Sequence, residues 1–435
     1  MSKSSRFQAP AGMHDILPED QKYYKKIYDV VSEIADFYDF GKIDTPILEN
    51  SELFSKSIGE STDIVGKEMY SFKTKGGDSL ALRPEWTAPI ARSYIENGMQ
   101  SLPQPVKLWY FGPCFRHERQ QAGRYRQFWQ FGFEVFGESD AVIDAQMIQI
   151  FYNIFKELKL KNIIVGINSI GDSNCRPYYK KILANYLKSK EMSLCVDCRK
   201  RVKENVLRVL DCKEEKCQSI KNQAPQIIDH LCEECKMRFK QTLEFLDEIE
   251  LPYSLNPYLV RGLDYYTKTV FEIFTDNKDA DSKDLQTLSG PLALAGGGRY
   301  DKLVKILGGR DVPACGGAAG VERIVKLLKA QDAGQEKSPE IPVFLAQLGD
   351  LAKRKCLKLF EEFRKANLRA SESLGKDSLK SQLNKANRLG VKYTLILGQK
   401  EALEGVIIIK DMETGKQDTI KLDKAVEEVK KRLKK

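Results

Sequence analysis

The chain has no apolar run long enough to span a membrane, and its first residues lack the apolar core that a secretory signal needs. We therefore expect no membrane partner and a cytoplasmic location. Disulfides are rare in that reducing compartment, so the ten cysteines are expected to serve packing or metal binding. Histidine is scarce, with three residues, and His230 beside a leucine is more typical of a structural hydrogen bond than of a ligand.

Length and composition set the scale of the fold. At 435 residues and 42% apolar content, the chain has room for about three domains of ordinary size, each with its own core. The net charge is +9, and residues 340–435 hold 22 Lys and Arg against 14 Asp and Glu, a net of +8. This basic tail is either a surface for a polyanionic partner or a solubility surface with a frayed basic end, and charge alone favours neither.

Residues 107–137 are expected to form two strands joined by a basic loop. In the second strand the odd positions are apolar, whereas the even ones hold chemically varied side chains: Trp129, Phe131, Phe133 and Val135 against Arg126, Phe128, Gln130, Gly132 and Glu134. The first strand similarly places Arg116 and Glu118 opposite its aromatic side chains. The simpler interpretation is a hairpin whose polar face meets only water. The polar face of this hairpin, however, combines side chains that suit a phosphate, a planar ring and an ammonium group, and this combination predicts a binding site.

Other stretches carry candidate site residues. A helix is expected from Pro18 to about Tyr38, followed by a strand that Pro46 interrupts. Glu85 and Thr87 precede a second helix, where they suit an ammonium group or, for Thr87, a helix cap.

Three further motifs lie downstream. The segment RGLDYY predicts a turn with Arg261 entering a strand, AGGGRY allows close backbone approach before Tyr300, and GGAAGVERIV predicts a helix that starts near Arg323. Each also fits an ordinary loop, tight turn or salt-bridged helix start.

Residues 171–250 are predicted to be a helical insertion within the first domain, 1–328. They contain two Cys-x-x-Cys pairs, Cys195 with Cys198 and Cys232 with Cys235, which suit zinc, as well as Cys212 and Cys217. Because 33 residues separate Cys198 from Cys232, we favour buried free thiols over a zinc site built from the two pairs.

The polar segment 329–339 is predicted to be a linker. Beyond it, in 340–435, apolar runs alternate with helical patterns, which indicates a small α/β domain. The whole chain is therefore expected to be of the α+β class.

FRHERQQAGRYRQF, followed by QFGFEVFG, resembles the second signature motif of class II aminoacyl-tRNA synthetases, in the form carried by histidyl-tRNA synthetases. GMHDILPED, LRPEWTAPIAR, LVRGLDYYTKTVFEI, AGGGRYDKLV and GGAAGVERIV stand in that family's order. The resemblance implies an antiparallel-sheet catalytic core followed by an anticodon-binding domain. It also implies a bacterial-type homodimer that activates L-histidine with ATP and Mg²⁺ and transfers it to its cognate tRNA.

Site residues follow from the resemblance, position by position. Arg116 and Arg261 would be catalytic, and Gln121 would meet the tRNA acceptor end. The ATP-binding residues would be Arg116, Glu118, Arg124, Phe128 and Arg323. The histidine-binding residues would be Glu85, Thr87, Gln130, Glu134, Arg261, Tyr265, Tyr266 and Tyr300. Trp86, Gln120 and Trp129 depart from the family pattern, and parity places Trp129 on the buried face.

Three other functions compete with this interpretation. A regulatory paralogue without catalysis, which associates with ATP phosphoribosyltransferase, typically lacks the arginine loop and the anticodon domain, and both are present here. RPEWTAP is also similar to prolyl and threonyl enzymes, but Glu134 and RGLDYY favour histidine. A pure RNA-binding protein would leave the adenylate residues without a role.

Overall fold

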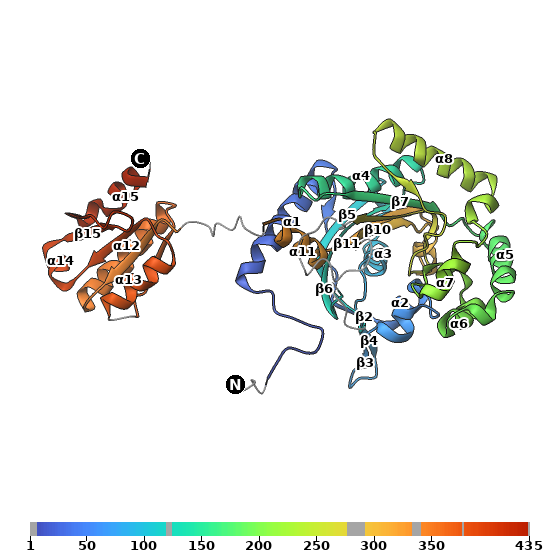
Figure 1. The fold of residues 1–435 in the computed structure, drawn as a ribbon, viewed down its shortest axis with the longest axis horizontal. Helices are drawn as coiled ribbons and strands as arrows, with labels where there is room; N and C mark the ends of the chain where they lie inside the picture. The colour runs from blue at the N-terminus through green and yellow to red at the C-terminus, as the bar shows by residue number, and fades with distance from the viewer. Residues whose placement is uncertain (1–6, 119–123, 276–291, 333–340, 376–377, 434–435) are drawn as a thin grey trace. The chain divides into compact units, whose positions relative to one another are not determined.

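The computed structural model describes residues 7–118, 124–275, 292–332, 341–375 and 378–433. The chain divides into two compact units, Met1–Asp332 and Ala333–Lys435, each with its own core (Figure 1). Among the helices so described, none combines the length and the apolar character required to cross a bilayer.

The first unit is built on an eight-stranded sheet in the order β1-β5-β6-β11-β10-β9-β7-β8. Its six central strands pair antiparallel, and only the short edge strands β1 and β8 pair parallel to their neighbours. The strands are β1 (Gly41–Lys42), β5 (Val106–Phe115), β6 (Gln127–Phe136), β7 (Ile163–Ser169), β8 (Ser254–Leu255), β9 (Thr267–Thr275), β10 (Leu292–Arg299) and β11 (Ala314–Gly320). A separate three-stranded sheet comprises β2 (Leu48–Asn50), β3 (Ser71–Lys73) and β4 (Ser79–Leu82).

Strand β6 has the two faces that its parity predicts. Phe131 and Phe133 pack against Phe151 of α4, with ring centroids 6.0 and 5.7 Å apart. On the opposite face, Phe128 belongs to a different apolar cluster, which contains Tyr110, Tyr265 and other residues of the insertion side. The sheet is therefore covered on both faces, and the even positions of β6 face the side where the candidate site lies.

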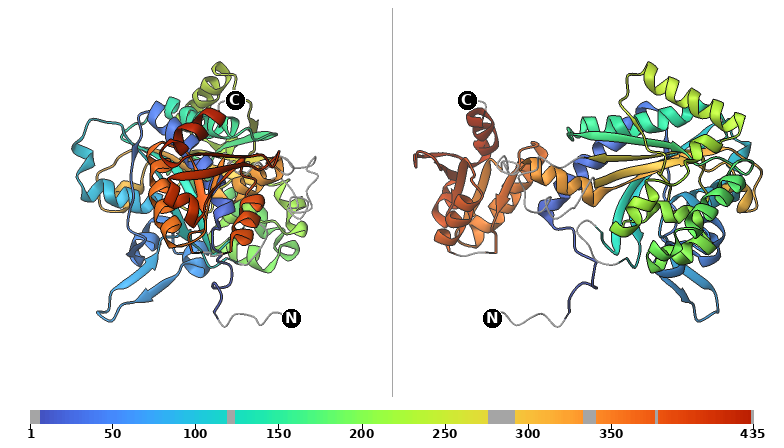
Figure 2. Two further views of the ribbon diagram at one scale, coloured as in Figure 1. Left: turned by 90° about the vertical axis from the view of Figure 1, so that its left-hand side faces the viewer. Right: turned by 45° about the vertical axis from the view of Figure 1, so that its right-hand side comes forward.

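Helices cover the two faces of the sheet (Figures 1 and 2). Four of them share the apolar cluster on the α4 side: α1 (Pro18–Phe37), α4 (Ala141–Glu157), α8 (Glu233–Glu248) and α11 (Val321–Asp332). The opposite side carries α3 (Thr87–Glu96), α5 (Arg176–Lys188), α6 (Val196–Glu204), α7 (Glu215–Lys221) and the 3₁₀ helix η4 (Val206–Asp211). The described part of the unit also contains the short helices α2 (Ser51–Ile58) and α10 (Leu303–Ile306), the π-helix η1 (Ile64–Glu68) and the 3₁₀ helices η2 (Met99–Ser101), η3 (Glu191–Ser193) and η5 (Ile227–His230).

The segment 171–250 is helical, as expected, but it does not pack as a separate body. Tyr179 and Leu183 of α5 join the cluster that contains Trp86 and Tyr300, whereas Phe239 and Leu246 of α8 join the α4 cluster. The insertion thus contributes to both cores of the first unit.

One expected boundary differs in the structure. Helix α11 continues to Asp332, so the predicted linker cannot start at residue 329; Leu328 is buried and Lys329 forms an ion pair with Asp20 of α1, which extends the packed helix. Helix α1 ends at Phe37, within one residue of the expected end, and Tyr38 rather than the exposed Phe37 packs against the core. The predicted linker residues 333–339 lie outside the described residues.

The second unit is a five-stranded sheet in the order β13-β12-β14-β15-β16, with parallel pairing in its first half and antiparallel pairing in its second. Its strands are β12 (Val343–Gln347), β13 (Ala370–Glu372), β14 (Tyr393–Leu397), β15 (Val406–Asp411) and β16 (Gln417–Lys421). Its helices are α12 (Asp350–Lys365), α13 (Leu379–Arg388), α14 (Gln399–Glu404) and α15 (Ala425–Leu433). The predicted small α/β domain is confirmed.

A buried ion pair ties the end of β10 to α4. Arg299 and Asp144 are 0% and 1% exposed, their atoms Nη1 and Oδ1 lie 2.5 Å apart, and Arg299 Nε also lies 3.0 Å from Asp301 Oδ1. Arg299 donates further bonds to the carbonyl oxygens of Glu138 and Asp140. The arginine of AGGGRY therefore has a structural role, which fixes the position of Tyr300 beside it.

We expect Asp144→Ala to lower the free energy of unfolding by about 3–5 kcal/mol, because it leaves the Arg299 guanidinium buried without its main partner. Urea unfolding followed by circular dichroism measures this change. The control is Asp29→Ala, which breaks an exposed pair with Lys25 on α1 and should cost only about 0.3–0.5 kcal/mol. Equal losses in the two variants would contradict a structural role for the buried pair.

Candidate active site

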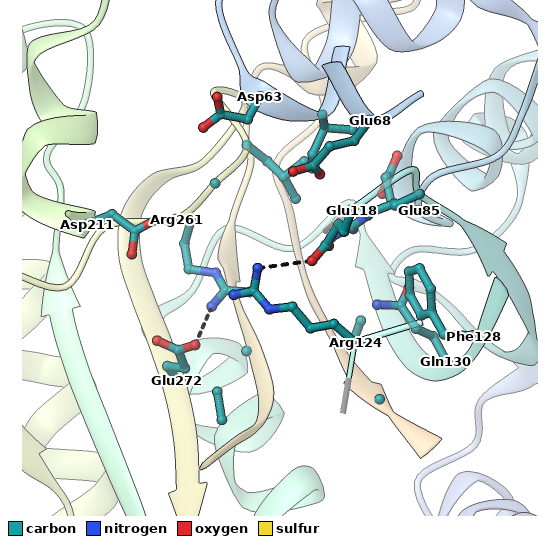
Figure 3. Close-up of a pocket in the computed structure, with 18 of the residues that line it drawn as sticks. Asp63, Glu68, Glu85, Glu118, Arg124, Phe128, Gln130, Asp211, Arg261 and Glu272 are labelled. Carbon is teal, nitrogen blue, oxygen red and sulfur yellow. Dashed lines mark hydrogen bonds and ion pairs between the residues drawn. The ribbon is translucent and has the colours of Figure 1, made fainter. Parts of the chain in front are cut away.

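A cleft of about 530 Å³ lies on the even-position face of β6, between the central strands and the insertion (Figure 3). Most of the predicted site residues line it: Glu85, Thr87, Arg116, Glu118, Arg124, Phe128, Gln130, Arg261, Tyr265, Tyr266 and Arg323. They come from segments that are far apart in the chain. The fold therefore brings the separate motifs together in one place.

Two predicted residues do not line the cleft, and one cannot be placed. Glu134 is 0% exposed and Tyr300 is 1% exposed, and both lie buried beside the cleft. Gln121 lies outside the described residues, as does Gln120.

Glu85 closes the N-terminal end of α3. Its carboxylate oxygens accept hydrogen bonds from the backbone N–H groups of Thr87, at 2.7 Å, and Ala88, at 2.8 Å. The cap considered for Thr87 is thus supplied by Glu85, which leaves the Thr87 hydroxyl free to donate to Glu134 Oε1 at 2.7 Å. Burial raises the pKa of Glu85, although these two N–H groups oppose the change. A cation beside Glu85 would favour its charged form.

Glu134 is the most deeply buried carboxyl of the site. It accepts from Thr87 and from the hydroxyl of Tyr300. Burial raises its pKa to about 8, although both hydrogen bonds lower it. The side chain can therefore hold or release a proton close to neutral pH.

Glycines make room for two of these side chains. A Cβ at Gly316, which pairs with Glu134 across β6 and β11, would lie 1.7 Å from Glu134 Oε2. A Cβ at Gly296 on β10 would lie 2.3 Å from Arg261 Nη1. The glycine-rich motifs thus allow charged side chains to lie flat against the sheet.

Arg261 crosses the floor of the cleft. Its Nη1 lies 3.5 Å from Glu272 Oε1, and its guanidinium carbon lies 5.8 Å from the centroid of the Tyr266 ring. Its Nε is buried, and no described residue accepts a hydrogen bond from it. A planar guanidinium with remaining donor capacity suits an anionic ligand.

The basic hairpin lines another part of the cleft. Arg124 Nη1 donates to Glu118 Oε2 at 3.0 Å (Figure 3). The Arg116 guanidinium carbon lies 5.4 Å from the Phe128 ring centroid. Arg323, in the first turn of α11, donates to the carbonyl oxygen of Ala293. Burial lowers the pKa of Arg323, and the positive charge of Arg124 lowers it further. Anionic groups at this end would relieve that repulsion.

The two tryptophans that depart from the family pattern are structural. Trp86 stacks on Tyr110 with ring centroids 4.7 Å apart, and the guanidinium carbon of Arg83 lies 3.4 Å from its ring centroid. Trp129 is partly buried against the α4 cluster and packs edge-on to Tyr24. Trp129 thus has the packing role that its parity predicts, whereas Trp86 also lines the cleft.

The sequence did not reveal several other residues of the cleft. Glu272 stands in the aromatic strand β9, where a lone carboxylate was the available signal. Arg208 of η4 donates to the carbonyl oxygen of Arg261 at 3.4 Å and pairs with Asp63. Asp63 and Arg208 belong to no motif, so only the fold could bring them to the cleft.

The structure does not bring the two Cys-x-x-Cys pairs together. Cys195 and Cys198 lie with Cys212 and Cys217, whereas Cys232 and Cys235 lie with Cys175 and Asp172. A single zinc site made of Cys195, Cys198, Cys232 and Cys235 is therefore wrong. The insertion folds each pair against a different partner.

Comparisons with known proteins cover nearly the whole chain. A family model described as "Histidyl-tRNA synthetase" matches residues 12–324, and one described as "Anticodon binding domain" matches residues 343–432. The chain belongs to the histidyl-tRNA synthetase family. It is accordingly an aminoacyl-tRNA ligase, and its first unit carries the class II catalytic fold.

Individual members of the histidyl-tRNA synthetase family are similar over their full length. A histidine–tRNA ligase of Dehalococcoides mccartyi strain 195 is 43% identical over 98% of this chain and 100% of its own. One of Desulforudis audaxviator is 42% identical over 97% of this chain and 98% of its own. The crystal structure of an apo histidyl-tRNA synthetase from S. aureus is 36% identical, covers 98% of this chain and 100% of its own, and has a TM-score of 0.78.

The buried carboxyl of Glu134 makes stability depend on pH. Since its pKa rises from 4.5 to about 8 on folding, the folded chain keeps a proton that the unfolded chain releases, and stability falls as pH rises between these values. We expect the neutral variant Glu134→Gln to be more stable than the parent at pH 8 by an amount on the order of a few kcal/mol.

Thermal unfolding of both proteins at pH 5 and pH 8 measures the effect, and the comparison at pH 5 is the internal control because there the difference should be small. A variant destabilised equally at both pH values would contradict the raised pKa.

Proposed function

We propose that the cleft joins L-histidine to ATP as histidyl-adenylate and pyrophosphate, before the histidine passes to the 3′ end of its tRNA. The observation that carries this proposal is the polarity of the cleft. Carboxyl and hydroxyl groups line the cleft at Glu85 and Thr87, and guanidinium groups line it at Arg116, Arg124 and Arg323. An ammonium group suits the first set and a triphosphate suits the second.

Activation requires the histidine carboxylate to attack the α-phosphate of ATP, so two anions must meet. We assign Arg261 to bind both anions, because it lines the cleft and its buried Nε has no described hydrogen-bond acceptor. Arg116 would bind the α-phosphate. Once phosphates reach the cleft, Arg261 would exchange its contact with Glu272 for them.

The adenine ring would stack between Phe128 and Arg323, and Glu118 would accept from its amino group. Arg124 and Arg323 would reach the γ-phosphate. Both arginines have protein acceptors in the structure, Glu118 and the Ala293 carbonyl oxygen, so the phosphates would replace contacts that already hold these side chains in place.

The histidine side chain would lie against Tyr265 and Tyr266, with Glu134 and Tyr266 at its two ring nitrogens. Because Glu134 is bonded to Thr87 and Tyr300 in the structure, its contact with substrate requires a rearrangement of these bonds. With a pKa of about 8, Glu134 can complement an imidazole in either protonation state. Glu85, Thr87 and Gln130 would hold the α-amino group.

Mg²⁺ would shield the phosphate charges during pyrophosphate release. Glu68 lines the cleft and offers a carboxylate to such an ion, and a divalent cation would oppose the rise in the pKa of Glu68 that its burial causes. We therefore assign Glu68 as the carboxylate nearest to the ion, whereas Glu118 serves the adenine amino group.

The second unit would bind the anticodon of the tRNA, and Gln121 would contact its acceptor end. ATP and tRNA are both used in translation, so we propose a cytoplasmic location. We propose a homodimer as well. Leu48 and Phe72 of the three-stranded sheet, and Ile47 just before it, are 43%, 46% and 43% exposed, which provides apolar surface for a second copy. The proposed working parts are the catalytic unit, which extends to Asp332, and the anticodon-binding unit 340–435.

Pyrophosphate exchange with each of the twenty amino acids tests the reaction. We expect exchange with histidine alone and only with Mg²⁺ present, because a site that bonds both imidazole nitrogens rejects side chains that lack them. Stronger exchange with proline or threonine would overturn the specificity, and no exchange at all would favour a regulatory protein.

Arg261 tests the catalytic assignment. We expect Arg261→Ala to slow single-turnover adenylate formation on the order of a hundredfold, with a smaller effect on ATP affinity, because the lost charge acts mainly in the transition state. Arg261→Lys should fall between, since it keeps the charge but loses the planar fork.

The matched control is Arg364→Ala, which removes an exposed arginine of the second unit and should not alter adenylate formation. A folded Arg261→Ala protein within a few fold of the parent would show that Arg261 is structural.

A further inference from the structure

Four buried cysteines meet beside the cleft, on three separate elements of the insertion. Cys195 immediately precedes α6, Cys198 lies in its first turn, Cys212 follows η4, and Cys217 lies in α7. Their Sγ atoms all lie within 4.8 Å of one another, and all four residues are buried. The sequence separates these residues into a Cys-x-x-Cys pair and two others, so only the fold shows that they form one set.

We propose that Cys195, Cys198, Cys212 and Cys217 bind one structural Zn²⁺ ion. Zinc prefers a tetrahedron of thiolates, and Zn–S bonds of about 2.3 Å place neighbouring sulfur atoms about 3.8 Å apart. The Sγ atoms of Cys195 and Cys212 lie 3.8 Å apart, as two ligands of such an ion would. All four corners are filled by protein, which is typical of structural rather than catalytic zinc.

The hydrogen bonds of the cluster favour thiolates. The backbone N–H of Cys198 donates to Cys195 Sγ and that of Cys195 donates to Cys217 Sγ, each at 3.3 Å. These sulfur atoms act as acceptors, and such bonds stabilise metal-bound thiolates. Buried negative charge is costly without a cation, so four thiolates at this place require a metal ion to balance them.

Positive charge lies next to the cluster. Arg201 lies one helical turn after Cys198, and its Nη2 forms an ion pair with Asp63 Oδ2 at 2.9 Å. A zinc ion with four thiolates carries two net negative charges, which this guanidinium would partly balance. A disulfide is the competing fate of close cysteines, but it would use only two sulfur atoms at a time and would require a separation of about 2.05 Å.

The second cluster offers a weaker case for a metal. Asp172 already accepts backbone N–H bonds from Asn174, at 2.9 Å, and Cys175, at 3.4 Å, so a local turn accounts for its position. Replacing two cysteines of this second cluster, Cys232 and Cys235, by serine is therefore a matched control for replacing two cysteines of the first cluster.

The ion would hold the insertion wall of the cleft in place. Cys195 and Cys212 line the cleft, and the segment between them carries Arg201 and Arg208, which both pair with Asp63. Arg208 also donates to the carbonyl oxygen of Arg261. Zinc therefore supports the cleft from outside the reacting groups.

Metal analysis of the full-length chain tests the proposal. We expect Cys198→Ser/Cys217→Ser to lose one zinc per chain and to unfold at a lower temperature, whereas Cys232→Ser/Cys235→Ser keeps that zinc. Zinc that survives in the first variant, or disappears entirely from the second, would overturn the proposal. Iron in place of zinc, with the colour of an iron–sulfur cluster, would overturn it too.

If the Cys198→Ser/Cys217→Ser variant fails to fold, substitution with cobalt tests the proposed zinc site instead. In the Cys232→Ser/Cys235→Ser protein, stripped of metal and reloaded with Co²⁺, we expect the visible bands of tetrahedral cobalt with strong thiolate charge transfer. Octahedral cobalt, or no uptake, would show that the four cysteines are ordinary buried thiols.

Discussion

The pairing of β6 with β5 on one side and β11 on the other is the constraint on which the cleft depends. It places Glu134 opposite Gly316 and leaves Phe131 and Phe133 to pack on α4. A shift of one residue in this register would exchange the two faces, which would bury Gln130 in an apolar core and expose phenylalanine to the cleft. Packing of the hydrophobic face of β6 thus determines the direction in which its polar side chains point. The positions of the β6 side chains in the cleft therefore depend on the apolar core.

The charges in the cleft are arranged as exchangeable pairs. Arg261 faces Glu272, Arg124 faces Glu118, and both Arg201 and Arg208 face Asp63. Each arginine is held in place by its carboxylate partner, so no buried charge is left uncompensated. A phosphate group can replace that carboxylate as the partner of the arginine while the guanidinium stays close to its present position. This arrangement differs from that of Arg299 and Asp144, which are fully buried and serve the fold alone.

Much of this structure follows from local sequence rules, and what does not follow depends on long-range contacts. Alternation in β6 predicted both of its faces, and the helix that starts at Pro18 begins where expected. The resemblance to a known family supplied the roles that alternation cannot give. Three features could not be predicted: that Glu134 would be sealed beside the cleft, that Glu85 would cap α3 in place of Thr87, and that Cys212 would join Cys195. The first and the third depend on residues distant in the chain, and the second depends on a choice between two neighbouring side chains that each could cap the helix, so a single sequence does not decide them.

The contact of Arg208 with the carbonyl oxygen of Arg261 has a thermodynamic consequence. It joins η4 of the insertion to the turn that positions the central guanidinium, so the two regions share a free energy of coupling. Coupling is reciprocal, so if Arg261 binds substrate as we propose, order in the insertion would strengthen that binding, and bound substrate would order the insertion by the same factor. In that case the order of the insertion would regulate substrate binding from within the same chain.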